Sequence, residues 1–175
     1  MTDIASVPKI AFTGGGTGGH IYPGLAVAFV LQKKTPCEIF WIGSEKGMDR
    51  SIVEKAGIGF FGIPSGKLRR SFSFKNFSDM FRVLSGYFAA KKILKKEKPD
   101  LLFSKGGFVS VPPVMAAASL GIPVFGHESD LTPGLATKLN LRKSEKLFLP
   151  YNDSLKFYRA KYKSRLEVSG NPVRV

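Results

Sequence analysis

A run of glycines near the amino terminus constrains this chain more than any other feature. Residues Thr13 to Tyr22 read T-G-G-G-T-G-G-H-I-Y, with five glycines in the six positions 14–19. The run follows a strand-like apolar stretch, Lys9 to Thr13, and precedes a helix-like stretch, His20 to Lys34. Glycines let backbone N–H groups approach an anion closely, and the following helix points the positive end of its dipole at the same place. The run therefore predicts a phosphate-binding loop between a strand and a helix.

Strand-like and helix-like segments alternate along the rest of the chain. Further strands are expected over residues 38–43, 60–64, 101–104, 123–127, 146–149 and 166–169. Further helices are expected over residues 48–56, 74–96, 114–120, 133–141 and 152–162. This alternation is typical of a parallel sheet with helices on both faces. We therefore expect an α/β fold, a Rossmann-like doubly wound parallel sheet, as a single domain over residues 1–175.

The composition limits the kind of protein this can be. A single cysteine, Cys37, excludes an internal disulfide, and two histidines make a His-rich metal site improbable. The amino terminus lacks a signal-peptide pattern, and the stretch from Val111 to Gly126 holds three prolines and is too short to span a bilayer. We expect a soluble or peripheral protein in the reducing cytoplasm. The net charge of +14 predicts attraction to polyanions, without choosing among lipid head groups, nucleic acid and phosphorylated substrates.

Two later segments are expected at the same edge of the sheet as the glycine run. Lys105-Gly106-Gly107 follows one predicted strand, and His127-Glu128-Ser129-Asp130 follows the next. Ligands of open parallel sheets bind at the carboxyl ends of the strands, near the point where strand order reverses. Lys105 strengthens an anion-binding interpretation. Plainer alternatives remain open: Gly106-Gly107 as a tight turn, Glu128 and Asp130 as helix-capping residues around Thr132-Pro133, and His127 as a structural residue.

The glycine run also satisfies a dinucleotide-binding pattern. Gly14, Gly16 and Gly19 fit G-x-G-x-x-G, and Glu45 lies just beyond the second predicted strand, where an acid would bind a ribose. A dinucleotide-binding oxidoreductase is therefore an alternative, although so many glycines satisfy many patterns. A P-loop is excluded, because His20 stands where its lysine would be.

The segment from Lys67 to Lys98 is strongly basic, with ten lysines and arginines against Asp79 and Glu97. Its aromatic residues recur at helical spacing, which fits either a core-facing stripe or, among so many cations, an anionic membrane surface. No recognised nucleic-acid module is present, so no nucleic-acid partner is expected. The candidate membrane-docking residues are Leu68, Arg69, Arg70, Phe72, Phe74, Lys75, Phe77 and Phe81.

Taken in order, the motifs resemble the amino-terminal half of the MurG family, the bacterial N-acetylglucosaminyltransferases that convert lipid I to lipid II in peptidoglycan synthesis. The matching segments are G-G-G-T-G-G-H-I-Y-P-G-L-A-V-A from Gly14, K-G-G-F-V-S from Lys105, S-L-G-I-P-V from Ser119, H-E from His127 and G-N-P-V-R from Gly170.

The resemblance implies a GT-B architecture in which two Rossmann-like domains face a cleft, with this chain as the acceptor-binding, membrane-side domain. It implies an inverting, metal-independent transfer of N-acetylglucosamine from UDP-N-acetylglucosamine to the muramyl sugar of lipid I, with no cofactor. The implied location is peripheral, on the cytoplasmic face of the bacterial inner membrane, with the anionic membrane surface as a partner.

The resemblance also implies roles for individual residues. Thr17, Gly18 and Gly19 would contribute to the substrate cleft, and His20 would be the general base for the acceptor hydroxyl. Gly106 and Gly107 would help to hold the lipid pyrophosphate, and Arg174 would reach the donor. Glu128 and Asp130 would also bind substrate.

The chain departs from the family in two respects. The usual H-E-Q-N segment is H-E-S-D here, so Asp130 replaces an amide that would contact the nucleotide sugar. The carboxy-terminal donor-binding domain is not in this sequence. A further alternative is therefore a non-catalytic membrane-anchoring partner subunit of a split glycosyltransferase.

Overall fold

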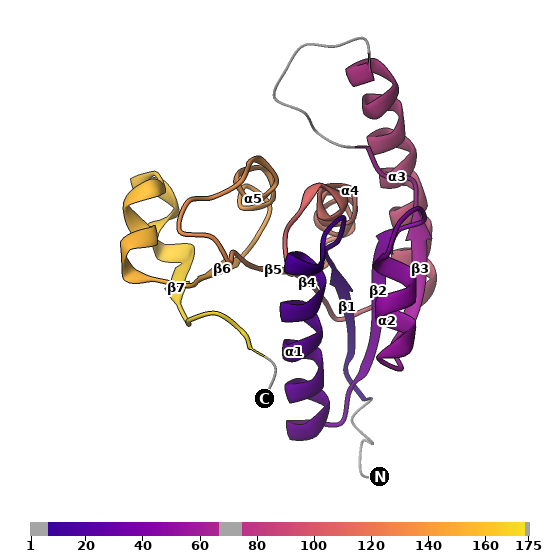
Figure 1. Cartoon of the computed structure of the whole chain (residues 1–175), viewed down its shortest axis with the longest axis horizontal. Coiled ribbons are helices and arrows are strands. Elements are labelled where there is room, and N and C mark those ends of the chain that lie inside the picture. The colour runs from indigo at the N-terminus through magenta and orange to yellow at the C-terminus, as the bar shows by residue number, and fades with distance from the viewer. Residues whose placement is uncertain (1–6, 67–74, 174–175) are drawn as a thin grey trace.

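The fold is built on a seven-stranded sheet whose strands all run parallel (Figure 1). The computed structural model describes residues 7–66 and 75–173, and of residues 75–80 only the backbone. The strands are β1 (Lys9–Thr13), β2 (Glu38–Ser44), β3 (Gly59–Ile63), β4 (Leu101–Ser104), β5 (Val124–His127), β6 (Lys146–Leu149) and β7 (Leu166–Val168). Their order is β3-β2-β1-β4-β5-β6-β7, so the direction of winding reverses between β1 and β4. The predicted doubly wound α/β fold is confirmed.

Helical segments connect the strands largely where the sequence predicts them. They are α1 (Gly18–Lys34), α2 (Asp49–Lys55), α3 (Lys75–Glu97), η1 (Phe108–Ser110), α4 (Val111–Ser119), α5 (Leu135–Asn140), η2 (Asn152–Phe157) and η3 (Ala160–Arg165). One predicted boundary and one predicted helix differ most from the structure. α4 begins at Val111 rather than Val114, because prolines are tolerated in a first helical turn. The single helix expected over 152–162 is instead two short 3₁₀ helices.

The two faces of the sheet bury different sets of side chains. Along β1, Ile10 and Phe12 contribute to the cluster under α1 and α2, whereas Ala11 contributes to the cluster under α3 and α4. This alternation follows from the two-residue period of a strand. Trp41 is fully buried in the first cluster, stacked near Phe12 with ring centroids 5.8 Å apart. Figure 1 shows α1 and α2 together on one side of the sheet.

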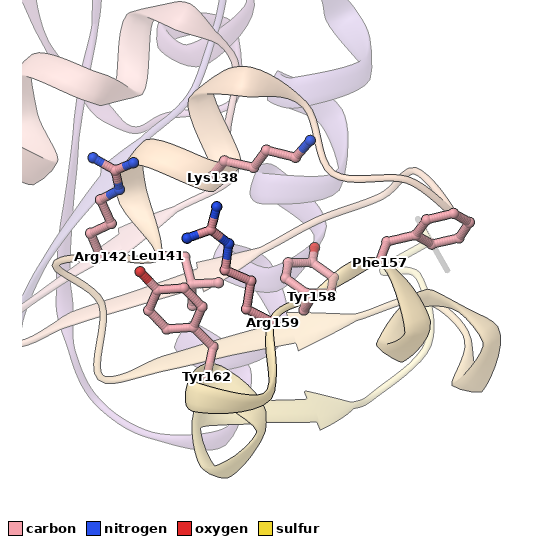
Figure 2. Close-up of a pocket in the computed structure, with 7 residues that line it drawn as sticks. All are labelled: Lys138, Leu141, Arg142, Phe157, Tyr158, Arg159 and Tyr162. Carbon is pink, nitrogen blue, oxygen red and sulfur yellow. The ribbon is translucent and has the colours of Figure 1, made fainter.

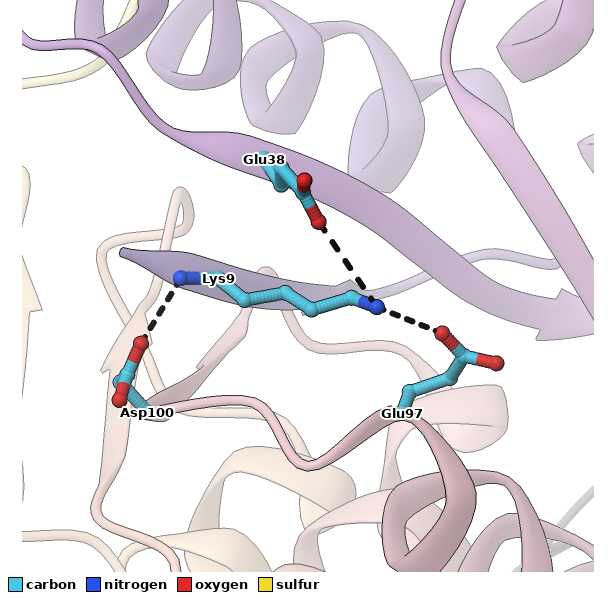
Figure 3. Close-up of polar contacts among 4 residues, drawn as sticks. All are labelled: Lys9, Glu38, Glu97 and Asp100. Atoms are coloured by element: carbon cyan, nitrogen blue, oxygen red, sulfur yellow. Dashed lines mark hydrogen bonds and ion pairs between the residues drawn. The ribbon is translucent and has the colours of Figure 1, made fainter. Parts of the chain in front are cut away.

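A charged cluster closes the amino-terminal end of the central strand (Figure 3). The ammonium group of Lys9 lies 2.7 Å from the carboxylate of Glu97 at the end of α3 and 3.8 Å from that of Glu38 on β2. The backbone N–H of Lys9 donates to the Asp100 carboxylate at 2.8 Å. The hydrogen bond to Glu97 raises the pKa of Lys9. The cluster therefore ties β1 to its neighbour β2 and to the end of α3.

We expect Lys9→Met to lower the free energy of unfolding by about 1 kcal/mol, because the Glu97 carboxylate is only 17% exposed and would lose its partner. The measurement is denaturant unfolding at low and high salt. Lys146→Met is the matched control, since Lys146 and Glu167 form a half-exposed pair, and it should cost close to nothing. Equal losses in the two variants would contradict a special role for Lys9.

Candidate functional site

Two glycine loops meet at the carboxyl ends of β1 and β4, where the strand order reverses. The backbone of Gly16 has φ 84°, and those of Gly106 and Gly107 have φ 84° and 78°, in the region that favours glycine. A Cβ at Gly107 would lie 2.6 Å from the carbonyl oxygen of Gly15 and 2.8 Å from Cδ2 of His20. Only glycine permits this approach, so the loops form one surface.

His20 lies in the first turn of α1, against the second glycine loop. Its backbone N–H donates to the carbonyl of Thr17 at 3.1 Å. Its imidazole packs beside Gly107, and Nδ1 is buried without a hydrogen-bond partner. Thr17 is the residue before the helix, and its side chain makes no capping hydrogen bond. Thr17, Gly18 and Gly19 are thus brought next to His20, at the positive end of the α1 dipole.

A cavity of about 260 Å³ opens in front of His20. Its lining combines the second glycine loop, the loop after β5 and the start of α5: His20, Gly107, Phe108, Glu128, Asp130, Gly134, Leu135, Ala136 and Thr137. Four residues that the sequence singled out from three separate segments therefore line one cavity. We refer to this cavity with the two glycine loops as the cleft.

Glu128 organises one wall of the cleft through hydrogen bonds to its own loop and to the start of α5. Its carboxylate accepts from the backbone N–H groups of Ser129 at 2.8 Å and Asp130 at 3.1 Å, and from the hydroxyl of Thr137 at 2.6 Å. Asp130 is exposed, and α5 begins at Leu135. The Glu128 carboxylate also accepts from the backbone N–H of Gly134, the residue before α5, at 3.4 Å. The capping alternative is therefore confirmed for Glu128, although the helix begins two residues later than Thr132-Pro133 predicts, and the described residues show no such bond from the side chain of Asp130.

Lys105 lies beneath the cleft rather than in it. The residue is 1% exposed, and its ammonium group donates to the hydroxyl of Ser129 at 2.5 Å. Burial lowers the pKa of Lys105 to about 8, although the charges of Glu128 and Asp130 oppose that shift. The anion-binding interpretation of Lys105 is wrong, because this side chain is buried and instead joins the end of β4 to the loop after β5.

Two buried residues that sequence reasoning missed hold the first glycine loop. The carboxylate of Asp49 accepts from the N–H of Gly16 at 3.1 Å and from the N–H of Ser44 at 3.0 Å. The indole N–H of Trp41 donates to the carbonyl of Gly14 at 3.0 Å. Asp49 has only the sequence pattern of an acid in a first helical turn, so no local signal distinguishes it.

His127 is structural, as its position at the end of a buried strand predicts. Its Nε2 lies 2.8 Å from the carbonyl oxygen of Gly170, and the ring is nearly fully buried. Burial lowers the pKa of His127 to about 4, aided by the nearby charge of Lys105. The neutral ring therefore donates to Gly170. Asn171 donates to the carbonyl of Ser129 at 3.2 Å, so the G-N-P segment lies at the edge of the cleft.

Most of the candidate membrane-docking surface lies outside the described residues. This applies to residues 68–74, to the side chains of Lys75 and Phe77, and to Arg174 of the substrate set. Phe81, Leu84 and Phe88 on α3 are 59%, 52% and 61% exposed, so a core-facing stripe is wrong for this part of the helix. Among the described residues, no helix has both the length and the apolar character needed to cross a bilayer.

Fold and cleft together define a class of protein: the Rossmann-like amino-terminal half of a GT-B glycosyltransferase. Residues 10–149 match the family model described as the glycosyltransferase family 28 N-terminal domain. The chain belongs to this family.

Named relatives agree with this assignment. The chain is 50% identical over 174 residues to the UDP-N-acetylglucosamine--N-acetylmuramyl-(pentapeptide) pyrophosphoryl-undecaprenol N-acetylglucosamine transferase of Treponema denticola, covering 95% of this chain and 44% of that protein. It is 52% identical over 166 residues to the protein of the same name from Clostridium botulinum strain 657, covering 95% and 46%. The crystal structure of Acinetobacter baumannii MurG superposes with a TM-score of 0.77 at 27% identity, covering 96% of this chain and 46% of that one.

The chain therefore spans somewhat less than half the length of the relatives it matches. The sequence raised two alternatives, a dinucleotide-binding oxidoreductase and a non-catalytic partner subunit. The comparisons do not favour either of them, because the two relatives and the family model are named as transferases.

We expect Asp49→Ala to lower the free energy of unfolding by about 2–3 kcal/mol, because two backbone N–H groups lose a charged acceptor. Denaturant unfolding measures the loss, and amide exchange should show that the N–H of Gly16 opens more often. Asp153→Ala is the control, since that carboxylate is 77% exposed and should cost less than about 0.5 kcal/mol. Unchanged exchange at Gly16 would show that the loop is held by other contacts.

The buried His127 predicts a loss of stability at mildly acid pH. Its folded-state pKa of about 4 lies below the ordinary 6.5, so the unfolded chain takes up the proton first as the pH falls. Between pH 6.5 and pH 5, the free energy of unfolding should fall by about 1–2 kcal/mol more in the native chain than in His127→Gln, which keeps an N–H donor for Gly170. Chemical unfolding across this range is the measurement, and parallel curves would contradict the assignment.

Proposed function

We propose that this chain is the acceptor-binding half of an inverting glycosyltransferase that moves N-acetylglucosamine from UDP-N-acetylglucosamine to the muramyl sugar of lipid I. The observation that carries the proposal is the cleft, in which His20 lies between two glycine loops, with its Nδ1 buried and unpartnered. Relatives at about 50% identity carry a name that states this transfer.

The chemistry requires a base at the acceptor hydroxyl. In the proposed reaction, the imidazole of His20 accepts the hydroxyl proton while the oxygen attacks the anomeric carbon of the donor sugar from the face opposite UDP. The bond from that carbon to the UDP oxygen breaks, and UDP leaves with the electron pair. The contact of the imidazole with Gly107 fixes the orientation of the ring, which is what general-base catalysis needs.

The glycine loops provide positions for the acceptor pyrophosphate. Thr17, Gly18 and Gly19 lie at the positive end of the α1 dipole, and Gly106 and Gly107 form the facing turn. Glu128 holds the opposite wall through its own loop, which leaves the exposed Asp130 as the acidic group directed to substrate. Arg174 would reach the donor from beyond the G-N-P segment.

We further propose that the donor pocket is completed by a second Rossmann-like domain, because the relatives are more than twice as long as the part matched here. The exposed aromatic residues of α3, with the basic segment before it, would dock the protein peripherally on the cytoplasmic face of the bacterial inner membrane. On this arrangement the acceptor lipid reaches the cleft from the membrane.

The test is to combine this chain with the donor-domain polypeptide of the Treponema denticola relative and to measure UDP release that depends on a lipid I analogue. We expect His20→Ala to lower kcat by roughly 10²–10⁴ with little change in KM, the usual scale for loss of a general base. His127→Gln is the control, because His127 is engaged with Gly170 and should leave kcat within about threefold at pH 7.5. Near-normal turnover by His20→Ala would remove His20 as the base, and absence of transfer by the native pair would overturn the proposed function.

A further inference from the structure

A second cavity, separate from the cleft, lies between α5 and the two 3₁₀ helices (Figure 2). Its volume is about 230 Å³. α5 and the turn after it contribute Lys138, Leu141 and Arg142, and the chain around η2 and η3 contributes the rest. The complete lining is Lys138, Leu141, Arg142, Phe157, Tyr158, Arg159 and Tyr162. Nothing in the proposed glycosyl transfer uses this cavity.

The cavity gathers three cations and no acid. Lys138, Arg142 and Arg159 are exposed at its rim, and none of them has an ion-pair or hydrogen-bond partner for its side chain among the described residues. Nearby lysines are different, since Lys146 pairs with Glu167 and Lys156 with Asp153. Like charges gathered without a counter-charge repel one another, and a bound anion removes that repulsion.

The basic side chains come from both sides of the cavity. Figure 2 shows the side chain of Arg159 rising from the chain between η2 and η3 towards α5, with Arg142 on one side and Lys138 on the other. Arginine presents a planar fork of N–H donors that matches the oxygens of a phosphate group. Two arginines and one lysine around a small cavity therefore suit a phosphate or pyrophosphate better than a single carboxylate.

The hydroxyl of Tyr158 is a second, independent observation that favours a bound hydrogen-bond acceptor in this cavity. Tyr158 is 8% exposed, and its hydroxyl is buried without a hydrogen-bond partner. Burial and the charge of Glu128 raise the pKa of Tyr158, so the hydroxyl stays a neutral donor. The carboxylate of Glu128 is occupied by Ser129, Asp130 and Thr137. An unpartnered buried hydroxyl is unfavourable, and an anion oxygen in the cavity would accept its hydrogen bond.

We propose that this cavity is a binding site for a phosphate or pyrophosphate group, held at the rim by Lys138, Arg142 and Arg159 and at the floor by the hydroxyl of Tyr158. The group could belong to a free phosphorylated molecule or to an anionic lipid head group, because the recognising chemistry is the same. The apolar walls formed by Phe157 and Tyr162 accommodate the part of the ligand that carries the phosphate.

The first experiment titrates the chain with inorganic pyrophosphate in a calorimeter. Arg142→Gln/Arg159→Gln should bind at least tenfold more weakly than the native chain. Lys33→Gln/Lys34→Gln removes the same charge from exposed positions at the end of α1 and should bind within twofold of native. Any pyrophosphate bound at the glycine loops is common to all of these proteins, so the difference between the two double variants reports on this cavity.

Tyr158→Phe is a more specific test than the arginine variant, because it removes only the unpartnered hydroxyl. We expect it to weaken pyrophosphate binding by about tenfold to a hundredfold, the range for loss of one hydrogen bond to a charged group, and to unfold at the same temperature as the native chain or higher. Lys138→Gln provides a fourth variant if the arginine pair proves to be needed for folding.

The second experiment identifies the source of the phosphate by cosedimenting the same variants with phosphatidylglycerol vesicles. Selective loss of pyrophosphate binding in the arginine variant supports a free ligand, and selective loss of vesicle binding alone supports a lipid head group. If the arginine variant matches the lysine variant in both experiments, or if Tyr158→Phe binds the ligand that the arginine variant has lost as tightly as the native chain does, the proposed site is overturned. Failure of glycosyl transfer would leave both results unaffected.

Discussion

The close approach of two glycine loops at the carboxyl ends of β1 and β4 is the constraint on which the cleft depends. The carbonyl of Gly15 occupies the space where a side chain at Gly107 would be, and the imidazole of His20 fills the rest. The backbone N–H of Lys105 donates to the carbonyl of Thr13 at 2.8 Å, so the two strands remain hydrogen-bonded up to the point where the loops begin. The pairing of β1 with β4 therefore brings the two glycine loops side by side, and the lack of a side chain at Gly107 allows their backbones to come into contact.

Buried polar groups then hold the loops in place. Asp49 and Trp41 form hydrogen bonds to the backbone of the first glycine loop. Lys105 joins the second glycine loop to the loop after β5. Glu128 organises that third loop and the start of α5. A buried polar group is stable only when it is hydrogen-bonded, so each of these contacts specifies one arrangement of the cleft wall. These contacts hold the floor of the cleft, whereas Asp130 on its wall is exposed.

Much of this could be read from local patterns. The glycine run, the double glycine and the H-E segment each follow a predicted strand, and parallel pairing brings the ends of strands to one edge. The roles of Lys105 and Asp49 could not be read in this way. A lysine before two glycines suggests an exposed cation, and its burial depends on Ser129, 24 residues further on. The carboxylate of Asp49 accepts a hydrogen bond from Gly16, 33 residues earlier in the chain, and no local sequence pattern predicts this contact.

The sequence by itself determined the alternation of strands and helices, the identity of the loops at the sheet edge and the family to which the chain belongs, because these depend on periodicity, on glycine positions and on matched motifs. Only the tertiary structure decided which polar side chains are structural and which are open to ligands. The packed chain buries His127 and Lys105, leaves His20 at the cleft and brings Lys138, Arg142, Arg159 and Tyr158 to the lining of one cavity. Burial and hydrogen bonding depend on neighbours that are distant in sequence, and only the packed chain brings those neighbours together.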